Sequence, residues 1–283
     1  MYLKDKQIEA IEHIGTYKFN TSSQLVTLGL YKNRDDVTRN LKPLTEGKKP
    51  FLKVFKFATH PTIGKLEYFY TLTSHGVRFL INEFGYEKSE IKHGSTTFFS
   101  KDYFHRKYMI NIHINLRSWL NDSNGEVDFL TYDFDKVGNN RSSKKSEYLK
   151  SLNRLDLENE GYIIPDIVTK FKVLEQDYIF LWEQHNGMDT KRIMSQILKH
   201  CIALEEQIVS KKFNFEKSHR VAIIFELENQ KNSVIKRLQE IESFKIFNNH
   251  FIFKTNKEMQ KDFFNNWELS NGEKVGFIQK STN

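Results

Sequence analysis

Two acidic residues near the middle of the chain have the spacing of a paired carboxylate site. Asp166 follows Pro165 in one apolar, strand-like run, and Glu183 lies near the end of the next run, seventeen residues on. If these runs are neighbouring strands, their ends bring the two carboxylates close together. Paired carboxylates hold a hard divalent cation, Mg²⁺ or Mn²⁺, through oxygen ligands. Such a metal can polarise a phosphodiester and activate a water molecule.

His185 follows Glu183 by two residues, so both side chains point to the same side of a strand. An imidazole at this position could contact the metal, hold a scissile phosphate or transfer a proton, and the sequence leaves these roles open. A simpler interpretation also stands for the acids. Taken alone, Asp166 fits a turn or edge strand and Glu183 fits a solvent-facing strand position.

The elements that must position these residues follow from the hydrophobic periodicity of the second part of the chain. The expected order is α-β-β-β-α-β. A helix over 102–120 precedes a strand over 126–133. Two strands over 162–173 and 178–184 form a hairpin across the four residues between them. The expected remainder is a helix over 189–209, a strand over 219–228, a helix over 233–244 and a strand over 250–254.

The first part of the chain has a different pattern. It predicts an amphipathic helix over 4–16, a short second helix after Thr21, and a third helix that Asn33 caps and Pro43 kinks or ends. Two alternating runs follow over 51–57 and 66–72, and a last helix spans 74–84. Three helices, a hairpin and a helix are the pattern of a winged helix-turn-helix.

Basic residues gather on the predicted third helix and hairpin. Residues 31–65 contain nine basic and three acidic residues, most of the net charge of +7 of the whole chain. In a winged helix these elements meet the major groove and the phosphate backbone, so we expect double-stranded DNA as the partner. An ordinary solvated basic face, or a protein-binding winged helix, remains the alternative. The predicted DNA-binding residues are Arg34, Arg39, Lys42, Lys48, Lys49, Lys53 and Lys56.

Composition narrows the class of protein. The chain has 283 residues, of which 39% are hydrophobic and 14% aromatic, enough for packed cores. A single cysteine excludes a disulfide framework within the chain, and no apolar run reaches the roughly 20 residues of a membrane helix. We therefore expect a cytoplasmic protein without a membrane partner. Its expected parts are a DNA-binding domain over 1–85, a linker over 86–101 and a second domain over 102–283.

The order of elements over roughly 102–255, together with the acidic pair, resembles the restriction-endonuclease-like fold of the PD-(D/E)xK nucleases. The resemblance maps the family signature onto Pro165-Asp166 and Glu183-Gln184-His185. It implies a mixed α/β or α+β fold and a metal-dependent nuclease. His185 stands where the family has a lysine. Some members carry that lysine elsewhere, and the resemblance then offers Lys170, Lys191 and Lys199.

A winged helix followed by such a domain resembles the plasmid replication-relaxation proteins and the MobC-type mobilisation relaxases. The resemblance rests on a histidine-bearing helix (His105 or His113), the Pro-Asp strand, and Glu183 followed by Gly187 and Thr190. It implies a plasmid origin as the DNA target. It also implies a Lys-Tyr pair in the next helix. The chain has no tyrosine after Tyr178, and Lys199-His200 is the nearest analogue.

Two classes of function follow. In the first, the chain is a relaxase-like or endonuclease-like enzyme that binds duplex DNA through its winged helix and nicks or cleaves it with Asp166, Glu183, His185, Lys199 and His105. In the second, the nuclease-like domain is inactive, and the chain is a DNA-binding replication or mobilisation accessory factor or a repressor. The missing lysine and tyrosine favour the second class, and the retained acids favour the first. A homodimer is considered under both.

Overall fold

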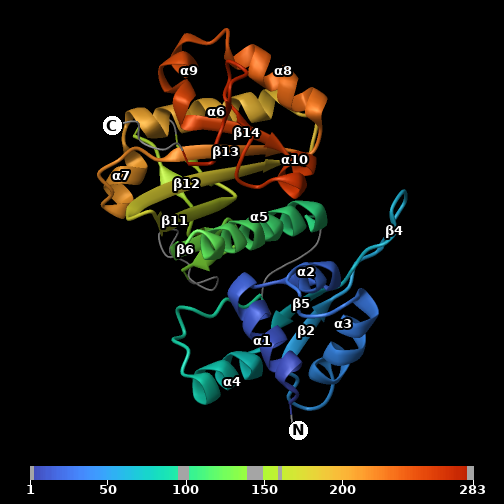
Figure 1. Cartoon of the computed structure of the whole chain (residues 1–283). Coiled ribbons are helices and arrows are strands. Elements are labelled where there is room, and N and C mark those ends of the chain that lie inside the picture. The colour runs from blue at the N-terminus through green and yellow to red at the C-terminus, as the bar shows by residue number, and fades with distance from the viewer. Residues whose placement is uncertain (1–2, 95–101, 139–148, 159–160, 279–283) are drawn as a thin grey trace. The chain divides into compact units, whose positions relative to one another are not determined.

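The computed structural model describes residues 3–94, 102–138, 149–158 and 161–278. The chain folds as a mixed α+β protein and divides into two compact units, Met1–Ile114 and Asn115–Asn283, which are described separately (Figure 1). Among the described residues, no helix combines the length and apolar character needed to span a membrane.

The first unit packs helices against a three-stranded antiparallel sheet of order β1-β5-β2. A second, two-stranded hairpin of β3 and β4 extends away from the helices (Figure 1). The elements are α1 (Asp5–Tyr17), β1 (Asn20–Thr21), α2 (Ser22–Thr27), α3 (Arg34–Leu41), a 3₁₀ turn (Lys42–Thr45), β2 (Leu52–Phe55), β3 (Thr59–His60), β4 (Gly64–Lys65), β5 (Phe69–Leu72) and α4 (Ser74–Phe84).

Side-chain caps explain where the helices of this unit begin. The Thr21 hydroxyl accepts a hydrogen bond from the Gln24 amide and starts α2, and the Asn33 side chain accepts one from the Asp36 amide and starts α3. Pro43 lies in the 3₁₀ turn directly after α3, so the expected end of this helix at the proline is confirmed.

The expected linker lies partly outside the described residues, which omit 95–101. Within its described part, Ile91 is buried in the core of the first unit, and the Lys92 amide donates to the Gly15 carbonyl at 2.7 Å. The segment just after α4 therefore packs on the first unit.

Helix α5 (Tyr103–Asp122) contributes residues to both units, because the boundary falls between Ile114 and Asn115. The second unit is built on a seven-stranded sheet of order β16-β15-β14-β13-β12-β11-β6. Its strands are β6 (Glu126–Tyr132), β11 (Ile167–Val173), β12 (Gln176–His185), β13 (Arg220–Phe225), β14 (Phe251–Thr255), β15 (Trp267–Glu268) and β16 (Lys274–Val275).

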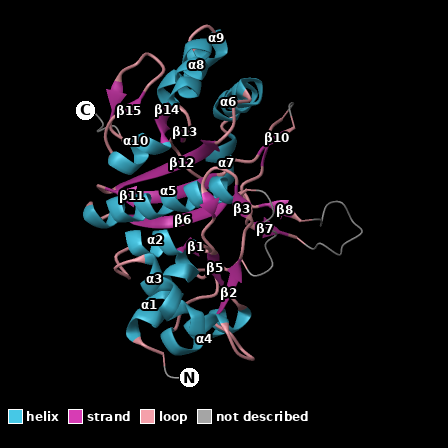
Figure 2. Cartoon of the chain, turned by 90° about the vertical axis from the view of Figure 1, so that its right-hand side faces the viewer, coloured by secondary structure: helices cyan, strands magenta, loops and turns pink. Residues whose placement is uncertain are grey.

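The sheet is mixed. Strands β6, β11 and β12 pair antiparallel, whereas β12, β13 and β14 run parallel. Helices α6 (Thr190–Glu205) and α7 (Ile208–Phe213) connect β12 to β13, so the order along the chain is α5-β6-β11-β12-α6-α7-β13, with four short strands among the described residues between β6 and β11. Those strands are β7 (Lys136–Val137), β8 (Lys150–Ser151), β9 (Leu155–Asp156) and β10 (Tyr162–Ile163) (Figure 2).

The two faces of this sheet bury different side chains. One face packs aromatic rings, with Phe277 against Phe180 and Trp182 at centroid distances of 4.3 and 5.3 Å. The other face packs aliphatic residues of α6 and α8 against β13 and β14. The other helices are α7 (Ile208–Phe213), α8 (Glu228–Leu238), α9 (Glu242–Phe247) and α10 (Asn256–Lys261), with a 3₁₀ turn at Asn248–His250.

Several boundaries differ from the expected ones. The strand expected over 162–173 is two strands in separate sheets, β10 and β11. The hairpin between β11 and β12 turns over two residues, Leu174 and Glu175, because both adopt left-handed backbone conformations with φ of 52° and 59°. The helix expected over 189–209 is two helices, α6 and α7, since Gln207 has a φ of 54°. The helix expected over 233–244 is also divided, into α8 and α9.

Candidate functional site

The β11–β12 pairing places Asp166 beside the end of β12. The Asp166 amide donates to the Trp182 carbonyl at 3.0 Å, and its carboxylate Oδ2 accepts the Gln184 amide at 2.7 Å. This second bond holds the carboxylate next to the backbone that carries Glu183. The structure therefore brings together the two acids that the sequence pairs.

Asp133 is a third acid at the same strand ends, and the sequence argument did not single it out. It follows β6 directly, and its amide donates to the Asp166 carbonyl at 2.9 Å. In the sequence, Asp133 could have been noticed as an acid at the end of the strand expected over 126–133. The pattern could not say which strand pairs with the one that carries Asp166.

Glu183 lies on the face of β12 that α6 covers, and only 2% of the residue is exposed. Burial raises the pKa of Glu183 well above its usual value, and the negative charges of Asp166 and Asp133 raise it further. The positive charge of Arg192, in the first turns of α6, acts in the opposite direction. The site is therefore a buried acid under the influence of two other carboxylates.

His200 of α6 is the direct partner of Glu183. Its Nε2 lies 2.7 Å from Glu183 Oε1, and both side chains are almost fully buried. Burial, together with the smaller effect of the nearby His185, lowers the pKa of His200 to about 3, so the imidazole is neutral over the physiological pH range. A neutral imidazole in hydrogen-bond contact fixes the rotamer of the Glu183 carboxyl.

The other predicted catalytic residues have different surroundings. His185 is buried near this pair, with its ring 5.5 Å from that of Phe225. Lys199 lines a groove on the outer side of α6. His105 belongs to the part of α5 in the first unit, and its role stays a prediction. His113, in the same part of α5, packs edge-on against Tyr17 at 4.7 Å.

Asn153 is a buried residue that the sequence argument missed. Its side-chain Nδ2 donates to the carbonyls of Pro165, Thr131 and Asp166 at 2.7, 3.2 and 3.3 Å. These carbonyls belong to the end of β6 and to the segment that leads into β11. One amide thus holds the two strand ends that carry Asp133 and Asp166.

Carboxylates are the ligands that a hard divalent cation prefers, so Asp166 and Glu183 are the residues that would hold such an ion. Asp166 and Asp133 raise the pKa of Glu183 by repulsion, and a cation between the carboxylates would relieve that repulsion. Within the described ranges, no three or more His, Cys, Asp or Glu side chains are arranged so that they could together hold a metal ion. A Mg²⁺ or Mn²⁺ ion held by Asp166 and Glu183 would therefore keep several water ligands.

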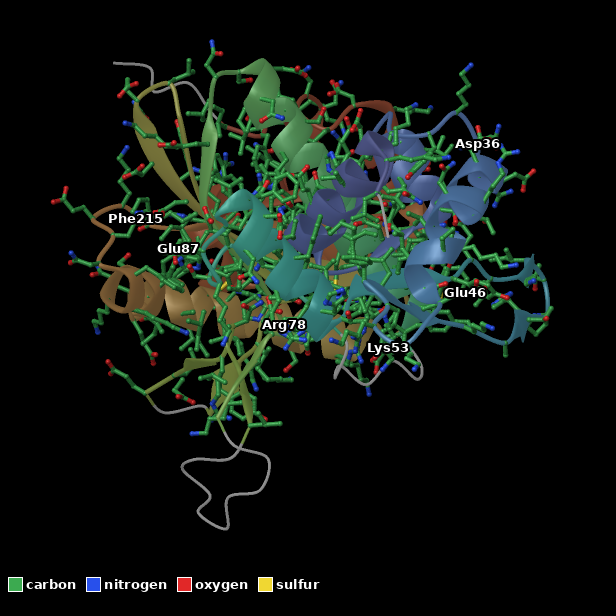
Figure 3. The ribbon with its side chains drawn as sticks, turned by 90° about the horizontal axis from the view of Figure 1, so that it is seen from below. Asp36, Glu46, Lys53, Arg78, Glu87 and Phe215 are labelled. Carbon is green, nitrogen blue, oxygen red and sulfur yellow. The ribbon has the colours of Figure 1, made fainter. Side chains whose placement is uncertain are left out.

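The predicted DNA-binding residues lie on the surface of the first unit. The side chains of Arg34 and Arg39 are 66% and 77% exposed, although Arg34 lies 3.8 Å from Glu67 and Arg39 pairs with Asp36. The predicted lysines are all exposed as well; they are Lys42, Lys48, Lys49, Lys53 and Lys56. Lys53 is labelled in Figure 3, as is the neighbouring acid Glu46.

Two lysines of this surface lie over the ring of Tyr68, at the base of the β3–β4 hairpin. The ammonium groups of Lys56 and Lys65 lie 5.8 and 5.4 Å from the centre of the Tyr68 ring. Arg34 and Lys65 also line a cavity between α3 and this hairpin, together with Thr38 and Tyr70. The acids Asp35 and Glu67 line the same cavity, so basic and acidic side chains border it together.

Comparisons of the chain with protein-family models, with curated proteins and with solved structures gave no match.

Proposed function

We propose that the chain is a plasmid or mobile-element DNA-processing protein of the replication-relaxation and MobC-type mobilisation kind. It binds duplex DNA, with a plasmid origin as the target, through the first unit, and it nicks or cleaves that DNA with the second unit in the cytoplasm. The observation that carries the proposal is the convergence of Asp133, Asp166 and Glu183 at the ends of three neighbouring strands.

The first unit supports this proposal as a winged helix-turn-helix. Helix α3 would enter the major groove, and the β3–β4 hairpin would lie along the phosphate backbone as the wing. Basic residues on both elements are exposed, which a phosphate-binding surface requires.

The second unit supports it through its topology. Three antiparallel strands, a crossing helix and a parallel strand are the arrangement expected of a restriction-endonuclease-like core. The acids lie at positions that match the Pro-Asp and Glu signature of that fold. A divalent ion held by Asp166 and Glu183 would polarise the phosphodiester and activate a water. Within the chain, His200 orients Glu183, and Arg192 offers a positive charge near the developing phosphate charge.

The burial of Glu183 favours a second candidate function. A carboxyl that is 2% exposed and bonded to a neutral histidine is poorly placed to bind a metal. In this alternative the second unit is inactive, and the chain is a DNA-binding accessory factor or repressor that acts through its first unit.

Replacement of the predicted phosphate contacts tests DNA binding. Lys48, Lys49 and Lys53 changed together to Ala should weaken binding to all duplexes and lower the slope of log K against log salt by up to about 2.7. Arg39→Ala should instead relax sequence preference if the guanidinium reaches a base edge. Lys211, Lys236 and Lys245 changed to Ala in the second unit are the matched control. Equal affinities of both triple variants in a salt titration would contradict the proposal.

Metal-dependent nicking of supercoiled plasmid tests the enzyme. Mn²⁺ should raise the melting temperature of the wild type, and Asp166→Asn should abolish both this shift and nicking while duplex binding persists. Asp177→Asn, a change of the same kind in an exposed strand position, is the control. His185→Lys, which supplies the lysine of the family signature, should raise nicking. If the wild type and the His185→Lys variant both bind metal but neither nicks the plasmid, the result supports the inactive alternative.

A further inference from the structure

A groove with a volume of about 470 Å³ runs along the outer side of α6. Its floor is formed by Met194, Leu198 and Ile202, which recur every fourth residue and therefore form one stripe along about two turns of the helix. All three side chains are partly exposed, whereas the neighbouring stripe of α6 is buried in the core.

Three cations border this apolar floor. They are Lys191 and Lys199 of α6 and Arg237 of α8. No carboxylate lines the groove, and no ion pair or side-chain hydrogen bond of these three residues occurs in the described part of the chain. Lys191 and Lys199 lie eight residues apart, about 12 Å along the helix axis, so the charges flank the length of the stripe. An anionic occupant would meet positive charge at both ends.

The shape and chemistry of the groove select among occupants. An apolar floor offers nothing to a DNA phosphate, and none of the described residues that line the groove has an aromatic ring on which a base could stack. An amphipathic helix places apolar side chains at every third or fourth position and can carry acids on either side of them. Methionine on such a floor adapts to the side chains it receives.

We propose that this groove is a docking site for an acidic amphipathic helix of a partner protein. Its apolar face lies on Met194, Leu198 and Ile202, and its carboxylates meet Lys191, Lys199 and Arg237. This assigns Lys199 to partner recognition and is independent of the chemistry at Asp166 and Glu183.

The test uses a fluorescein-labelled helical peptide of about 15 residues, with leucine at every fourth position and glutamate on both sides of the leucine stripe. Fluorescence anisotropy should show saturable binding to the full chain that weakens with added salt. Lys199→Glu and Arg237→Glu should each weaken it about tenfold or more. Lys211→Glu and Lys245→Glu, which reverse exposed charges outside the groove, should leave the affinity unchanged.

Charge exchange separates docking from damage to the fold. A matched peptide with lysine in place of glutamate should bind the Lys191→Glu, Lys199→Glu double variant more tightly than it binds the wild type, and that variant should melt at the wild-type temperature. Four results would each overturn the proposal: no saturation with wild type, equal affinities of groove and control variants, displacement of the peptide by a short DNA duplex, or self-association that Lys199→Glu abolishes.

Discussion

Asn153 joins the two strand ends that carry Asp133 and Asp166. The side chain is 1% exposed, and its Nδ2 is the group that reaches the carbonyls of both segments. Asparagine is polar and common in loops, so nothing in its spacing distinguishes it from a surface residue. Its position follows from the packing of β7–β10 against the main sheet, which the sequence pattern does not contain.

Asn153→Ala should loosen Asp166 without unfolding the chain. Loss of the amide removes the donor at 2.7 Å from the Pro165 carbonyl, while the Asp166 carbonyl keeps the Asp133 amide, and should cost about 1–3 kcal/mol of unfolding free energy. The specific result is faster hydrogen exchange at the amides of Asp133 and Gln184, which both donate to Asp166. Asn40→Ala removes a side-chain amide in the first unit and serves as control. Unchanged exchange at both amides would show that Asn153 does not position Asp166.

Buried histidines should make the protein sensitive to acid. His219 is 1% exposed, and burial lowers its pKa well below the usual value of 6.5. Below pH 6.5 the unfolded chain takes up a proton that the folded chain refuses, so stability is lost as the pH falls below that value. One such group contributes a slope of up to about 1.4 kcal/mol per pH unit.

His219→Asn should remove that contribution. Chemical denaturation of the wild type and the variant between pH 4.5 and 7 should give a difference in unfolding free energy that changes with pH only below about 6.5. His200 and the carboxylates contribute equally to both proteins and cancel in this comparison. A difference that is constant over the range would mean that His219 takes up its proton over the same pH range in the folded and unfolded states.

At the scale of elements, the strength of the local pattern decided which predictions succeeded. Long amphipathic segments and capped helices such as α1, α3 and α4 lie close to their expected bounds, because each carries several turns of periodicity or a cap. The two-residue strands β15 and β16 were missed, since two residues show no alternation. β15 depends on pairing with β14, a contact distant in sequence, and β16 pairs with β15.

The same limit applies to the site. The spacing of Asp166 and Glu183 on two predicted strands was enough to expect that they meet. The buried partner of Glu183 was not predictable, because it depends on which face of α6 packs on the sheet. His200 lies on the buried stripe of α6, next to Cys201. The helical spacing of a histidine on this stripe is the same whether its ring packs in the core or forms a hydrogen bond with Glu183.

The turn between β11 and β12 stores conformational strain that substitution can release. Leu174 and Glu175 both have positive φ, a conformation that costs a residue with a side chain about 1–2 kcal/mol. Changing the pair to Asn-Gly should therefore stabilise the second unit by about 1 kcal/mol or more, measured by thermal denaturation. The pair changed to Ala-Ala removes the same side chains and keeps the strain. Equal melting temperatures of the two variants would contradict this explanation.

At the scale of the molecule, each unit has its own core, but the two differ in how far along the chain that core extends. The hydrophobic core of the first unit contains residues up to Ile91, whereas the core of the second unit includes Phe277. The Phe277 ring is fully buried and contacts Phe180 and Trp182 of β12 and Trp267 of β15.

Phe277→Ala should therefore strongly lower the stability of the second unit. Removal of a fully buried aromatic ring costs about 3–5 kcal/mol. Ile246→Ala, at a side chain on α9 that is 75% exposed, should change stability by no more than about 0.5 kcal/mol. Urea denaturation followed by tryptophan fluorescence measures both. A small loss for Phe277→Ala would show that the aromatic face tolerates the cavity.

The position of Phe277 also sets an order of events during synthesis. A ribosome releases the chain from its first residue onward, so the first unit can fold while the second is still being made. The aromatic face of the second sheet lacks the ring that contacts Phe180, Trp182 and Trp267 until Phe277 has been made, after the strands from β6 to β16. While those strands are being made, the nascent chain therefore carries a finished first unit and a second sheet that lacks this ring. That interval is when holding chaperones would find their binding surface.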